Sequence, residues 1–375
     1  MARPKKDEAV VTETKSDLKY DLSKIDAALT EIKKQIGTDS IINVGSIETI
    51  PRVPCRSPTI GYIFGAGGTP MGKIIELYGP ESAGKSLVAQ NIIADFQRIG
   101  KFAAYIDLEY SFDPKYAAIQ GVDCSPEKFA LIQPNSGEDA FTAVERLAES
   151  GQVGVIVFDS IAAAVPKAEL EGEMTDAQMG AQARLMGKGL RKVTAVLGKN
   201  NCCLVLINQT RSKIGISYGD PTVTPGGAAA KFFSSIRCEV RKGDKDEGED
   251  GEDMIGIKAK IKNVKNKTSV PFRKGEIFIS FKDGIDVYGE YVDFGVSFGI
   301  IQKGGAWYTG PNGERFQGRA NVIKALKENE TLFNSIKEKV DAQLKGNPIQ
   351  DVELPETISV EDNSIESLAS QALGD

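Results

Sequence analysis

The sequence predicts an α/β fold in which a mostly parallel, twisted sheet follows an N-terminal helix and precedes a small C-terminal α/β domain. Strand-like and helix-like runs alternate from Gly72 to about Lys242, and this alternation is typical of a parallel sheet with helices on both faces. The run 153–158, VGVIVF, is almost wholly apolar, as expected of a strand buried on both faces. With 375 residues, the chain is long enough for one large domain and a smaller one.

The N-terminal part changes character at Leu22. Residues 1–20 mix charged and small polar residues without a period, which predicts a disordered leader. From Leu22 to Ile36 apolar residues recur at gaps of three and four, which predicts a helix with one apolar stripe. Residues 39–70 are expected to form short strands and turns.

The central strands are expected at Ile74–Tyr78, Phe102–Leu108, Phe129–Ile132, Val153–Phe158 and Cys203–Asn208. An acidic, glycine-containing loop at 244–253 is followed by a run of lysines and arginines between Lys258 and Lys274 without an acid. Helices at Ala320–Glu328 and Thr331–Leu344 indicate the small C-terminal domain. Residues 346–375 carry acids but no lysine or arginine, which predicts an acidic and mostly disordered tail.

The composition excludes several classes of protein. No apolar run approaches the about 18–20 residues of a membrane helix, and the N-terminus lacks the apolar segment of a signal peptide. The five cysteines have no metal-ligand spacing, and Cys202 and Cys203 begin an apolar run, so we expect reduced core thiols in a cytoplasmic protein. The chain has no histidine, which excludes histidine-based catalysis and histidine-ligated metals.

A phosphate-binding P-loop connects the first central strand to a helix-like run. Its residues are Gly79, Pro80, Glu81, Ser82, Ala83, Gly84, Lys85 and Ser86. The two glycines let backbone N–H groups point inward, and the following helix directs its positive end at the same place. Lys85 is expected to reach the β- and γ-phosphates, and the Ser86 hydroxyl to hold Mg²⁺. The sequence therefore predicts that the chain binds a nucleoside triphosphate.

Polar residues follow three other strands of the predicted sheet. Asp159 has the position of a carboxylate that supports Mg²⁺ through its water shell. Glu109 is suited to orient or deprotonate the attacking water, and Gln209 to sense the γ-phosphate. Ligands of open α/β sheets bind at the carboxyl ends of the strands, so together these residues indicate hydrolysis. The alternative is that Glu109 and Gln209 only solubilise the strand ends.

From Gly65 to about Gly346 the chain resembles the RecA family, the bacterial-type homologous recombinases. The matching segments are 65–72 (GAGGTPMG), 78–86 (YGPESAGKS), 166–173 (PKAELEGE), 207–209 (INQ), 213–215 (KIG), 264–267 (VKNK) and 304–308 (GGAWY). A generic P-loop ATPase would share the P-loop and not the other segments. The resemblance implies ATP and Mg²⁺ as cofactors and a RecA-type P-loop NTPase core.

The resemblance also implies roles for single residues around ATP. Glu109 would activate water, and Gln209 would couple the γ-phosphate to the DNA-binding loop behind it. Tyr116, in the segment that begins at Asp113, and Tyr288 would pack on the adenine. The residues implied at the subunit boundary are Lys265 and Lys267, which would reach the phosphates of the neighbouring subunit, and Phe232, which would pass the signal from Gln209.

DNA contact is expected on two loops, at about 171–180 and 210–227, and on the helix between them. The residues implied are Met179, Arg184, Arg191, Arg211, Lys213, Ile214, Gly226 and Gly227. Arginine and lysine would meet phosphates, the glycines could form a phosphate nest, and the two apolar residues would wedge between bases. The alternative is that these are surface loops with incidental charge.

The implied assembly is an open helical filament of one chain type. In this family the N-terminal helix, within residues 21–50, docks on the neighbouring subunit, and the acidic tail restrains access of duplex DNA. The alternatives are a helix packed on its own core and a solubilising tail. The expected domains are a leader (1–20), the docking segment (21–50), the ATPase core with its DNA-binding loops (51–290), a small C-terminal domain (291–345) and the tail (346–375).

The resemblance predicts a DNA-dependent ATPase that pairs single-stranded DNA with homologous duplex DNA and exchanges strands in DNA repair and the SOS response. Further partners would be a self-cleaving repressor and single-strand-binding protein, and no membrane. A ring helicase and a non-catalytic, ATP-gated DNA-binding scaffold are the alternatives. Some positions depart from the family pattern, among them Ser86, Leu108, Tyr110 and Ala228, as in a phage-encoded or divergent bacterial copy.

Overall fold

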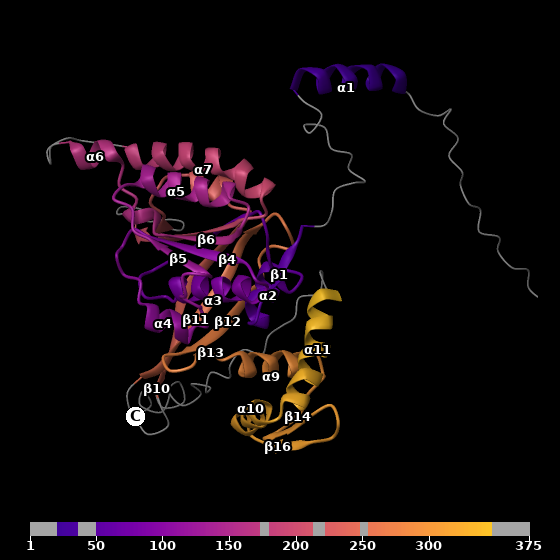
Figure 1. Ribbon diagram of the computed structural model, residues 1–375. Coiled ribbons are helices and arrows are strands. Elements are labelled where there is room, and N and C mark those ends of the chain that lie inside the picture. The colour runs from indigo at the N-terminus through magenta and orange to yellow at the C-terminus, as the bar shows by residue number, and fades with distance from the viewer. Residues whose placement is uncertain (1–20, 37–49, 173–179, 213–221, 248–253, 347–375) are drawn as a thin grey trace, which may run out of the picture. The chain divides into compact units, whose positions relative to one another are not determined.

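The computed structural model describes residues 21–36, 50–172, 180–212, 222–247 and 254–346 (Figure 1). The chain divides into two compact units, residues 1–49 and residues 50–375. The first unit contains helix α1 (Leu22–Ile36), which has the bounds that the apolar periodicity predicted. Two residues of its apolar stripe, Ile25 and Ile32, are 42% and 41% exposed, so the stripe is not fully buried in this chain.

The second unit is built around a sheet of nine strands among the described residues. These strands are β3 (Ile74–Gly79), β4 (Phe102–Asp107), β5 (Phe129–Ile132), β6 (Val153–Asp159), β7 (Cys203–Gln209), β10 (Ile236–Glu247), β11 (Met254–Asn266), β12 (Lys274–Ser280) and β13 (Gly284–Ile285). Their order is β13-β12-β11-β10-β3-β7-β6-β4-β5. The strands from β10 to β5 in this order pair in parallel, and β10 to β13 pair antiparallel. The predicted α/β fold with a mostly parallel sheet is confirmed.

Helices cover both faces of this sheet (Figure 1). The helices of the central region are α2 (Pro58–Phe64), α3 (Lys85–Arg98), α4 (Pro114–Ile119), α5 (Gly137–Glu149), α6 (Lys167–Glu171), α7 (Ala181–Lys199) and α8 (Ala229–Phe233), with a 3₁₀ turn at Ile161–Ala163. Two short strand pairs lie outside the large sheet: β1 (Arg52–Pro54) with β2 (Gly68–Pro70), and β8 (Arg211–Ser212) with β9 (Thr222–Val223).

The sheet separates two hydrophobic clusters. One contains side chains of α3 together with Ile75 and Leu77 of β3, and the other contains side chains of α5 and α7 together with Ile156 and Phe158 of β6. Every residue of β3 and of β6 is buried, which explains why these strands are apolar almost throughout. The adjacent Cys202 and Cys203 are buried in different clusters, and their thiols are free.

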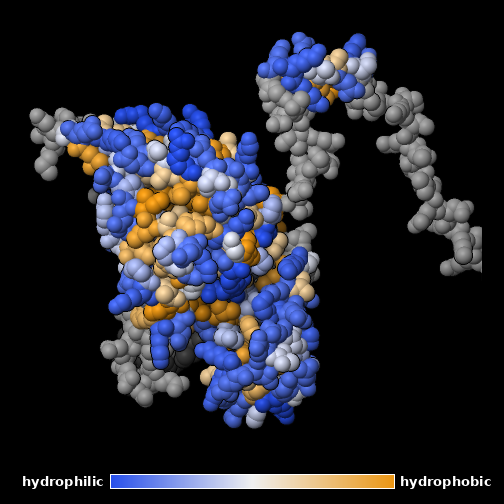
Figure 2. All heavy atoms as spheres, in the orientation of Figure 1, coloured by the Kyte–Doolittle hydropathy of each residue, from blue (hydrophilic) through white to orange (hydrophobic). Residues whose placement is uncertain are grey.

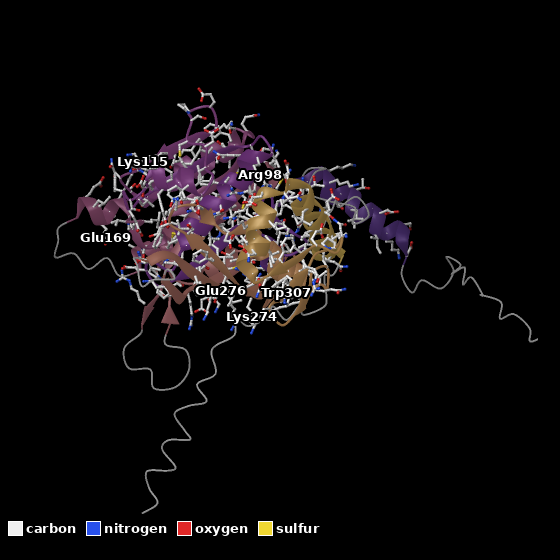
Figure 3. The ribbon with its side chains drawn as sticks, turned by 90° about the horizontal axis from the view of Figure 1, so that it is seen from below. Arg98, Lys115, Glu169, Lys274, Glu276 and Trp307 are labelled. Atoms are coloured by element: carbon white, nitrogen blue, oxygen red, sulfur yellow. The ribbon has the colours of Figure 1, made fainter. Side chains whose placement is uncertain are left out.

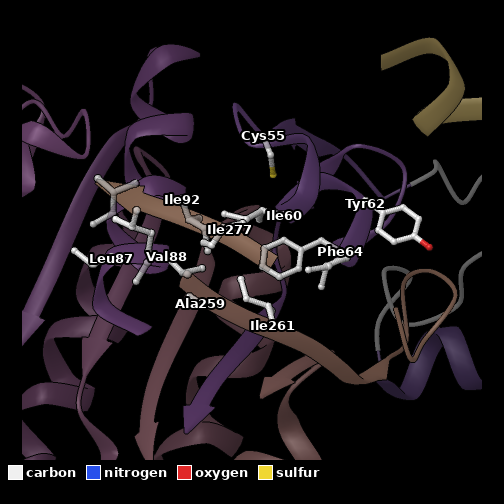
Figure 4. Close-up of a cluster of buried hydrophobic side chains, with 14 of the residues drawn as sticks. Cys55, Ile60, Tyr62, Phe64, Leu87, Val88, Ile92, Ala259, Ile261 and Ile277 are labelled. Atoms are coloured by element: carbon white, nitrogen blue, oxygen red, sulfur yellow. The ribbon is translucent and has the colours of Figure 1, made fainter. Parts of the chain in front are cut away.

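The antiparallel strands pack on the helix that follows the P-loop. Figure 4 shows Leu87, Val88 and Ile92 of α3 in one cluster with Ala259 of β11 and Ile277 of β12. Burial of a side chain of this size contributes roughly 1.5–3 kcal/mol to the free energy of unfolding. The antiparallel part of the sheet is therefore fixed to the start of α3, where the P-loop ends.

Residues 39–70 were expected to form only short strands and turns, but helix α2 lies within this range. The Ser57 hydroxyl oxygen caps the helix by accepting a hydrogen bond from the backbone N–H of Ile60 (3.1 Å), and Pro58 is the first helical residue. All seven residues of α2 are buried, so the helix has no polar face and its sequence shows no amphipathic period. The sequence shows the Ser57-Pro58 pair that is typical of a helix start, but it does not show the alternation of apolar and polar residues by which a helix is usually predicted.

A small domain follows the sheet. Its elements are α9 (Val287–Ser297), β14 (Gln302–Gly304), β15 (Trp307–Thr309), β16 (Arg315–Gln317), α10 (Arg319–Glu328) and α11 (Glu330–Gly346). The two last helices begin one residue before their expected positions. The expected boundary between residues 290 and 291 falls inside α9, so this helix connects the two domains. Trp307 is 43% exposed on the small domain (Figure 3). The Arg315 guanidinium lies 5.2 Å from the centre of its ring.

The exposed surface is uneven in character. On the face seen in Figure 2, hydrophobic side chains gather over the region of β4, β5 and β6, whereas the C-terminal domain is mostly hydrophilic. Leu131 of β5, which ends the sheet, and Ile119 of α4 are 41% and 37% exposed. Among the described helices, none is both long and apolar enough to cross a membrane.

A buried carboxylate joins α9 to the central domain. Glu290 accepts hydrogen bonds from the Ser57 hydroxyl (2.6 Å) and the Thr59 backbone N–H (3.0 Å), and both donors lie at the start of α2. Its Oε1 atom is buried and has no partner among the described residues. Burial, with Asp286 nearby, raises the pKa of Glu290 from 4.5 to about 7.

We predict that Glu290→Gln makes the chain more resistant to unfolding at pH 8 than the wild type, but not at pH 4.5. The raised pKa means that the folded wild type loses stability as pH rises from 4.5 to about 7, whereas a neutral amide does not titrate. The difference in free energy of unfolding should grow by about 2–3 kcal/mol over this range, measured by urea denaturation. Glu338→Gln, which removes an exposed carboxylate of α11, is the matched control. A difference that is the same at both pH values would contradict the prediction.

Candidate functional site

A cavity of about 480 Å³ lies where the P-loop meets the carboxyl ends of the central strands. Residues 82–86 form one wall of this cavity. Gly84 precedes the first residue of α3 with a φ of 93°, a left-handed conformation that glycine adopts without strain. The segment therefore has the strand–loop–helix arrangement that a phosphate site requires.

Lys85 is buried in this loop. Its Nζ donates hydrogen bonds to the carbonyl oxygens of Gly79 (3.1 Å) and Pro80 (2.5 Å). Burial lowers the pKa of Lys85, and the nearby carboxylates of Asp159 and Glu109 act in the opposite direction. The P-loop therefore holds a cation beside two acids, in position to exchange its carbonyl partners for phosphate oxygens.

Ser86 of the P-loop is in contact with Asp159, the last residue of β6. The Ser86 hydroxyl donates to Asp159 Oδ2 (3.0 Å), and the Tyr105 hydroxyl donates to the same atom (2.5 Å). Burial raises the pKa of Asp159 to about 6, although the hydrogen bond from Tyr105 opposes this shift. A hydroxyl and a carboxylate are oxygen donors of the kind that Mg²⁺ prefers. No group of three metal-binding side chains occurs in the described parts of the chain, so phosphate oxygens and water would have to complete the coordination.

Glu109 and Gln209 meet, although they are 100 positions apart in the sequence. Gln209 Nε2 donates to Glu109 Oε1 at 3.1 Å, and the Ser160 hydroxyl donates to the same oxygen. Glu109 and Ser160 come just after β4 and β6, and Gln209 is the last residue of β7. These three strands are neighbours in the sheet and run parallel. An exposed carboxylate near Lys85 is thus held by two donors.

Asp107 shapes this region and was given no role in the sequence analysis. It is fully buried and accepts hydrogen bonds from the backbone N–H groups of Ser111 (3.2 Å) and Phe112 (3.1 Å) and from Gln133 Nε2 (3.1 Å). These bonds close the loop that carries Glu109. The sequence feature that could have identified Asp107 is its position two residues before Glu109, at the end of the same strand.

The far wall of the cavity contains aromatic side chains. Tyr116 and Asp113, at the start of α4, line it as expected, and Phe281, directly after β12, lines it as well. The structure does not bring Tyr288 to this cavity: its ring packs on Phe333, 4.7 Å between ring centroids, and lines a neighbouring cavity of about 510 Å³. Phe281, which sequence reasoning missed, occupies the place expected for Tyr288. The other lining residues are Leu87, Gln90, Tyr105, Ser111, Phe112, Lys242, Gly243, Ile257 and Lys258.

Lys265, Lys267 and Phe232 lie together, away from the cavity of their own chain. Lys265 Nζ donates to the carbonyl oxygens of Lys231 (2.6 Å) and Phe232 (3.1 Å). Burial, with the adjacent positive charge of Lys267, lowers the pKa of Lys265. The Phe232 side chain is 71% exposed, and Lys267 is exposed too. These residues form a surface at the end of α8 that is open to another molecule.

The DNA-binding candidates occupy two places. Arg184 and Arg191 are exposed on α7, and Arg211 is exposed directly beyond Gln209. Met179, Lys213 and Ile214 lie outside the described residues.

Gly226 and Gly227 both have left-handed backbone conformations, with φ of 80° and 70°. A Cβ at Gly226 would come within 2.6 Å of Ile161, and one at Gly227 within 2.9 Å of Ala183. Close packing therefore requires these glycines, in addition to any contact with phosphate.

A buried ionic network lies beneath the site and was not foreseen from the sequence. Glu76 of β3 accepts hydrogen bonds from Asn208 Nδ2 (3.0 Å) and Arg237 Nε (2.5 Å), and the Arg237 guanidinium lies 3.8 Å from the centre of the Tyr78 ring. Asn208 also donates to the carbonyl oxygen of Pro225 (3.3 Å). The network joins β3, β7 and β10 to the segment that carries the glycine pair.

Comparison with known proteins agrees with this arrangement. A model of the RecA N-terminal domain matches residues 23–286, and a model of the RecA C-terminal domain matches residues 289–345. Protein RecA of Chlorobaculum tepidum is 44% identical over 330 residues, which cover 87% of this chain and 94% of the relative. Protein RecA of Bacillus licheniformis is 45% identical, and that of Bacillus subtilis strain 168 is 44% identical, each over 318 residues that cover 84% of this chain and 90% of the relative.

We predict that Arg237→Met lowers the free energy of unfolding by about 3–5 kcal/mol, because Glu76 would remain buried without its cation. Adding Glu76→Gln to this variant should recover part of the loss, since the uncompensated charge is then gone. Urea denaturation of the single and double variants measures both effects. Lys128→Met, which breaks an exposed pair with Asp123, should cost less than about 1 kcal/mol and is the control. A loss for Arg237→Met as small as that of the control would contradict the account.

Proposed function

The chain belongs to the RecA family, and we propose how its residues divide the work of that family's activity. It is a DNA-dependent ATPase and homologous recombinase that acts in DNA repair, binds DNA and assembles with itself. One observation carries the residue-level proposal: the hydrogen bond between Gln209 and Glu109. It connects a carboxylate beside the phosphate site to the segment that leads into the second expected DNA-binding loop.

The cavity is proposed to hold ATP, with its triphosphate on the P-loop. The backbone of residues 79–86 and the side chain of Lys85 would bind the phosphates. Tyr116 and Phe281 supply aromatic surfaces for the adenine, and Asp113 is placed to accept a hydrogen bond from it. Tyr288 is not part of this proposal, because it lines only the neighbouring cavity, whereas Phe281 lines both.

Ser86 and Asp159 fit Mg²⁺ by their chemistry and their contact with each other. Ser86 would bind the ion directly and Asp159 through water. When bound, Mg²⁺ neutralises charge on the β- and γ-phosphates. Ionisation of Asp159 is favoured near a cation, which opposes the effect of its burial.

Glu109 is proposed to orient the water that attacks the γ-phosphate and to accept its proton. The carboxylate is exposed near Lys85 and can reach solvent, while Ser160 and Gln209 fix its orientation through Oε1. A general base must be positioned before it can act, and the second oxygen of Glu109 is the one left for water. Gln209 would exchange its bond to Glu109 for a phosphate oxygen and so transmit nucleotide state to the DNA-binding loop.

Lys265 and Lys267 are proposed to act on the ATP of a neighbouring subunit. They do not line the cavity of their own chain, and they lie beside the exposed ring of Phe232. In this position they would stabilise charge that develops on the γ-phosphate, as an arginine supplied in trans does in other ATPases. Phe232 would carry the signal from Gln209 across the same boundary.

DNA is proposed to bind along α7 and the loops beside it. Arg184, Arg191 and Arg211 would meet phosphates, which makes binding dependent on salt and nearly independent of sequence. Gly226 and Gly227 would offer backbone N–H groups to a phosphate. Met179, Lys213 and Ile214 are kept as candidates from the sequence alone.

The finer partners and location are also proposals. We propose single-stranded DNA as the strand on which helical filaments form and homologous duplex DNA as the second substrate, with exchange between them. A self-cleaving repressor and single-strand-binding protein are the further partners that the family resemblance suggests. We propose the cytoplasm as the location, because ATP and DNA are both available there.

We predict that Lys85→Ala abolishes ATP-dependent assembly on single-stranded DNA, because no other residue of the P-loop carries a positive charge. Sedimentation of the protein with DNA, with and without ATP, measures the effect. Lys73→Ala, just before β3, changes a lysine outside the cavity lining and is the control. Assembly of Lys85→Ala at the level of the control would show that the nucleotide binds elsewhere.

We predict that Glu109→Gln lowers the turnover of ATP about 10²- to 10⁴-fold while DNA affinity stays close to that of the wild type. The amide cannot accept the proton of the attacking water, but it occupies the same volume. Steady-state hydrolysis and DNA binding on the same preparation separate the two effects. Glu127→Gln, exposed before β5, is the control. If turnover were unchanged, another group would have to activate the water.

A further inference from the structure

One wall of the nucleotide cavity is supplied by strands outside the P-loop. Lys242 and Gly243 of β10, with Ile257 and Lys258 of β11, line the cavity together with residues 82–86. No function follows for these positions from the sequence alone. Two of the four are lysines, so the directions of their side chains decide which of them brings positive charge to a cavity that is expected to hold an anion.

Strand β10 brings Lys242 to the phosphate end of the cavity. β10 runs parallel to β3 with Glu239 opposite Tyr78, so both strands reach the same edge of the sheet. At this edge the two backbones touch, because a Cβ on Gly79 would come within 1.9 Å of the carbonyl oxygen of Val240. Lys242 follows two residues later and therefore lies beside the P-loop.

The side chain of Lys242 lies on the face of the sheet that packs against the P-loop. Lys242 is directly opposite Ala259 in the antiparallel pairing of β10 with β11, and opposite residues share a face. A Cβ on Gly84 would lie 3.4 Å from the Cβ of Ala259, and Figure 4 shows Ala259 near Val88 of α3. Gly84, Ala259 and Lys242 are thus successive neighbours.

Lys258 has a different position. It lies next to Gly243 of β10, because a Cβ added to Gly243 would be 2.8 Å from the Cβ of Lys258. On its other side, Lys258 pairs with Phe278 of β12. Successive residues of a strand alternate between faces, so Lys258 points away from the face of Ala259. Lys242 is therefore the lysine of this wall that is directed at the P-loop.

Lys242 is available for a ligand. Its side chain is exposed, and it makes no ion pair with another residue in the described part of the chain. The regular pairing of β10 with β11 is interrupted directly after it, between Lys242 and Lys245. Such irregularities re-aim side chains at the ends of strands and occur often beside active sites.

We propose that Lys242 is a further nucleotide-binding residue of this chain, which contacts the phosphates of the ATP held by its own P-loop. This inference rests on the proposed function, because it takes the cavity to be the ATP site. The residue supplies a second cation from within the subunit, beside the P-loop that carries Lys85, and it is distinct from the lysines that would act on a neighbour's ATP. It binds and positions the phosphates and takes no part in activating water.

The test is the affinity of Lys242→Met for ATP, ADP and adenosine, measured by titration calorimetry without DNA. Loss of one partly solvated cation should weaken ATP binding about five- to tenfold, ADP binding less, and adenosine binding not at all. Lys242→Arg should keep ATP affinity within about twofold, because the charge remains. Lys262→Met is the control, since Lys262 is an exposed lysine of the same sheet that does not line the cavity.

The outcomes separate this inference from the function on which it rests. If Lys242→Met binds ATP as the wild type does while Lys85→Ala does not, Lys242 is not a nucleotide residue and the proposed ATP site stands. If neither variant loses affinity, the cavity is not the ATP site and both proposals fail. Equal loss of ATP and adenosine would show that Lys242 acts on the base or on the fold, which overturns the phosphate contact.

Discussion

The buried carboxylate of Glu76 accepts hydrogen bonds from Asn208 and Arg237, and the rest of the site depends on this network. It fixes the relative positions of three strands: β3, which leads into the P-loop, β7, which ends in Gln209, and β10, which carries Lys242. A buried carboxylate is tolerated only when its charge is compensated, so the network constrains the register of all three strands at once. The parallel alignment then brings residues from distant parts of the sequence to a single edge of the sheet.

Opposite charges concentrate at that edge. Lys85 lies near the carboxylates of Asp159 and Glu109. Burial lowers the pKa of Lys85, whereas these two acids raise it. Binding of a nucleotide with its cation would give each of these groups a partner of opposite charge. In the proposed function, the Gln209–Glu109 hydrogen bond would link this change to the proposed DNA-binding segment, because Gln209 could bond either to the glutamate or to a phosphate oxygen. Nucleotide and DNA would therefore influence each other through one amide.

Sequence reasoning predicted what depends on local pattern. The P-loop, the central strands and α1 follow from short-range periodicity and glycine placement, and the strand ends identified Glu109, Asp159 and Gln209. It could not predict contacts that depend on strand order, such as the network around Glu76 or the position of Lys242. Helix α2 was missed because it is buried on all sides, and Tyr288 was placed at the adenine because the sequence does not show which aromatic residue faces the cavity. Phe281 does so, directly after β12.

In the proposed function, DNA occupancy controls ATP hydrolysis through the edge of this sheet in an assembled filament. The most direct measurement is the rate of ATP hydrolysis by the full chain with and without single-stranded DNA, with negative-stain electron microscopy of the same samples. We expect strong stimulation by DNA together with open helical filaments. Equal rates with and without DNA, or closed rings in place of filaments, would contradict it.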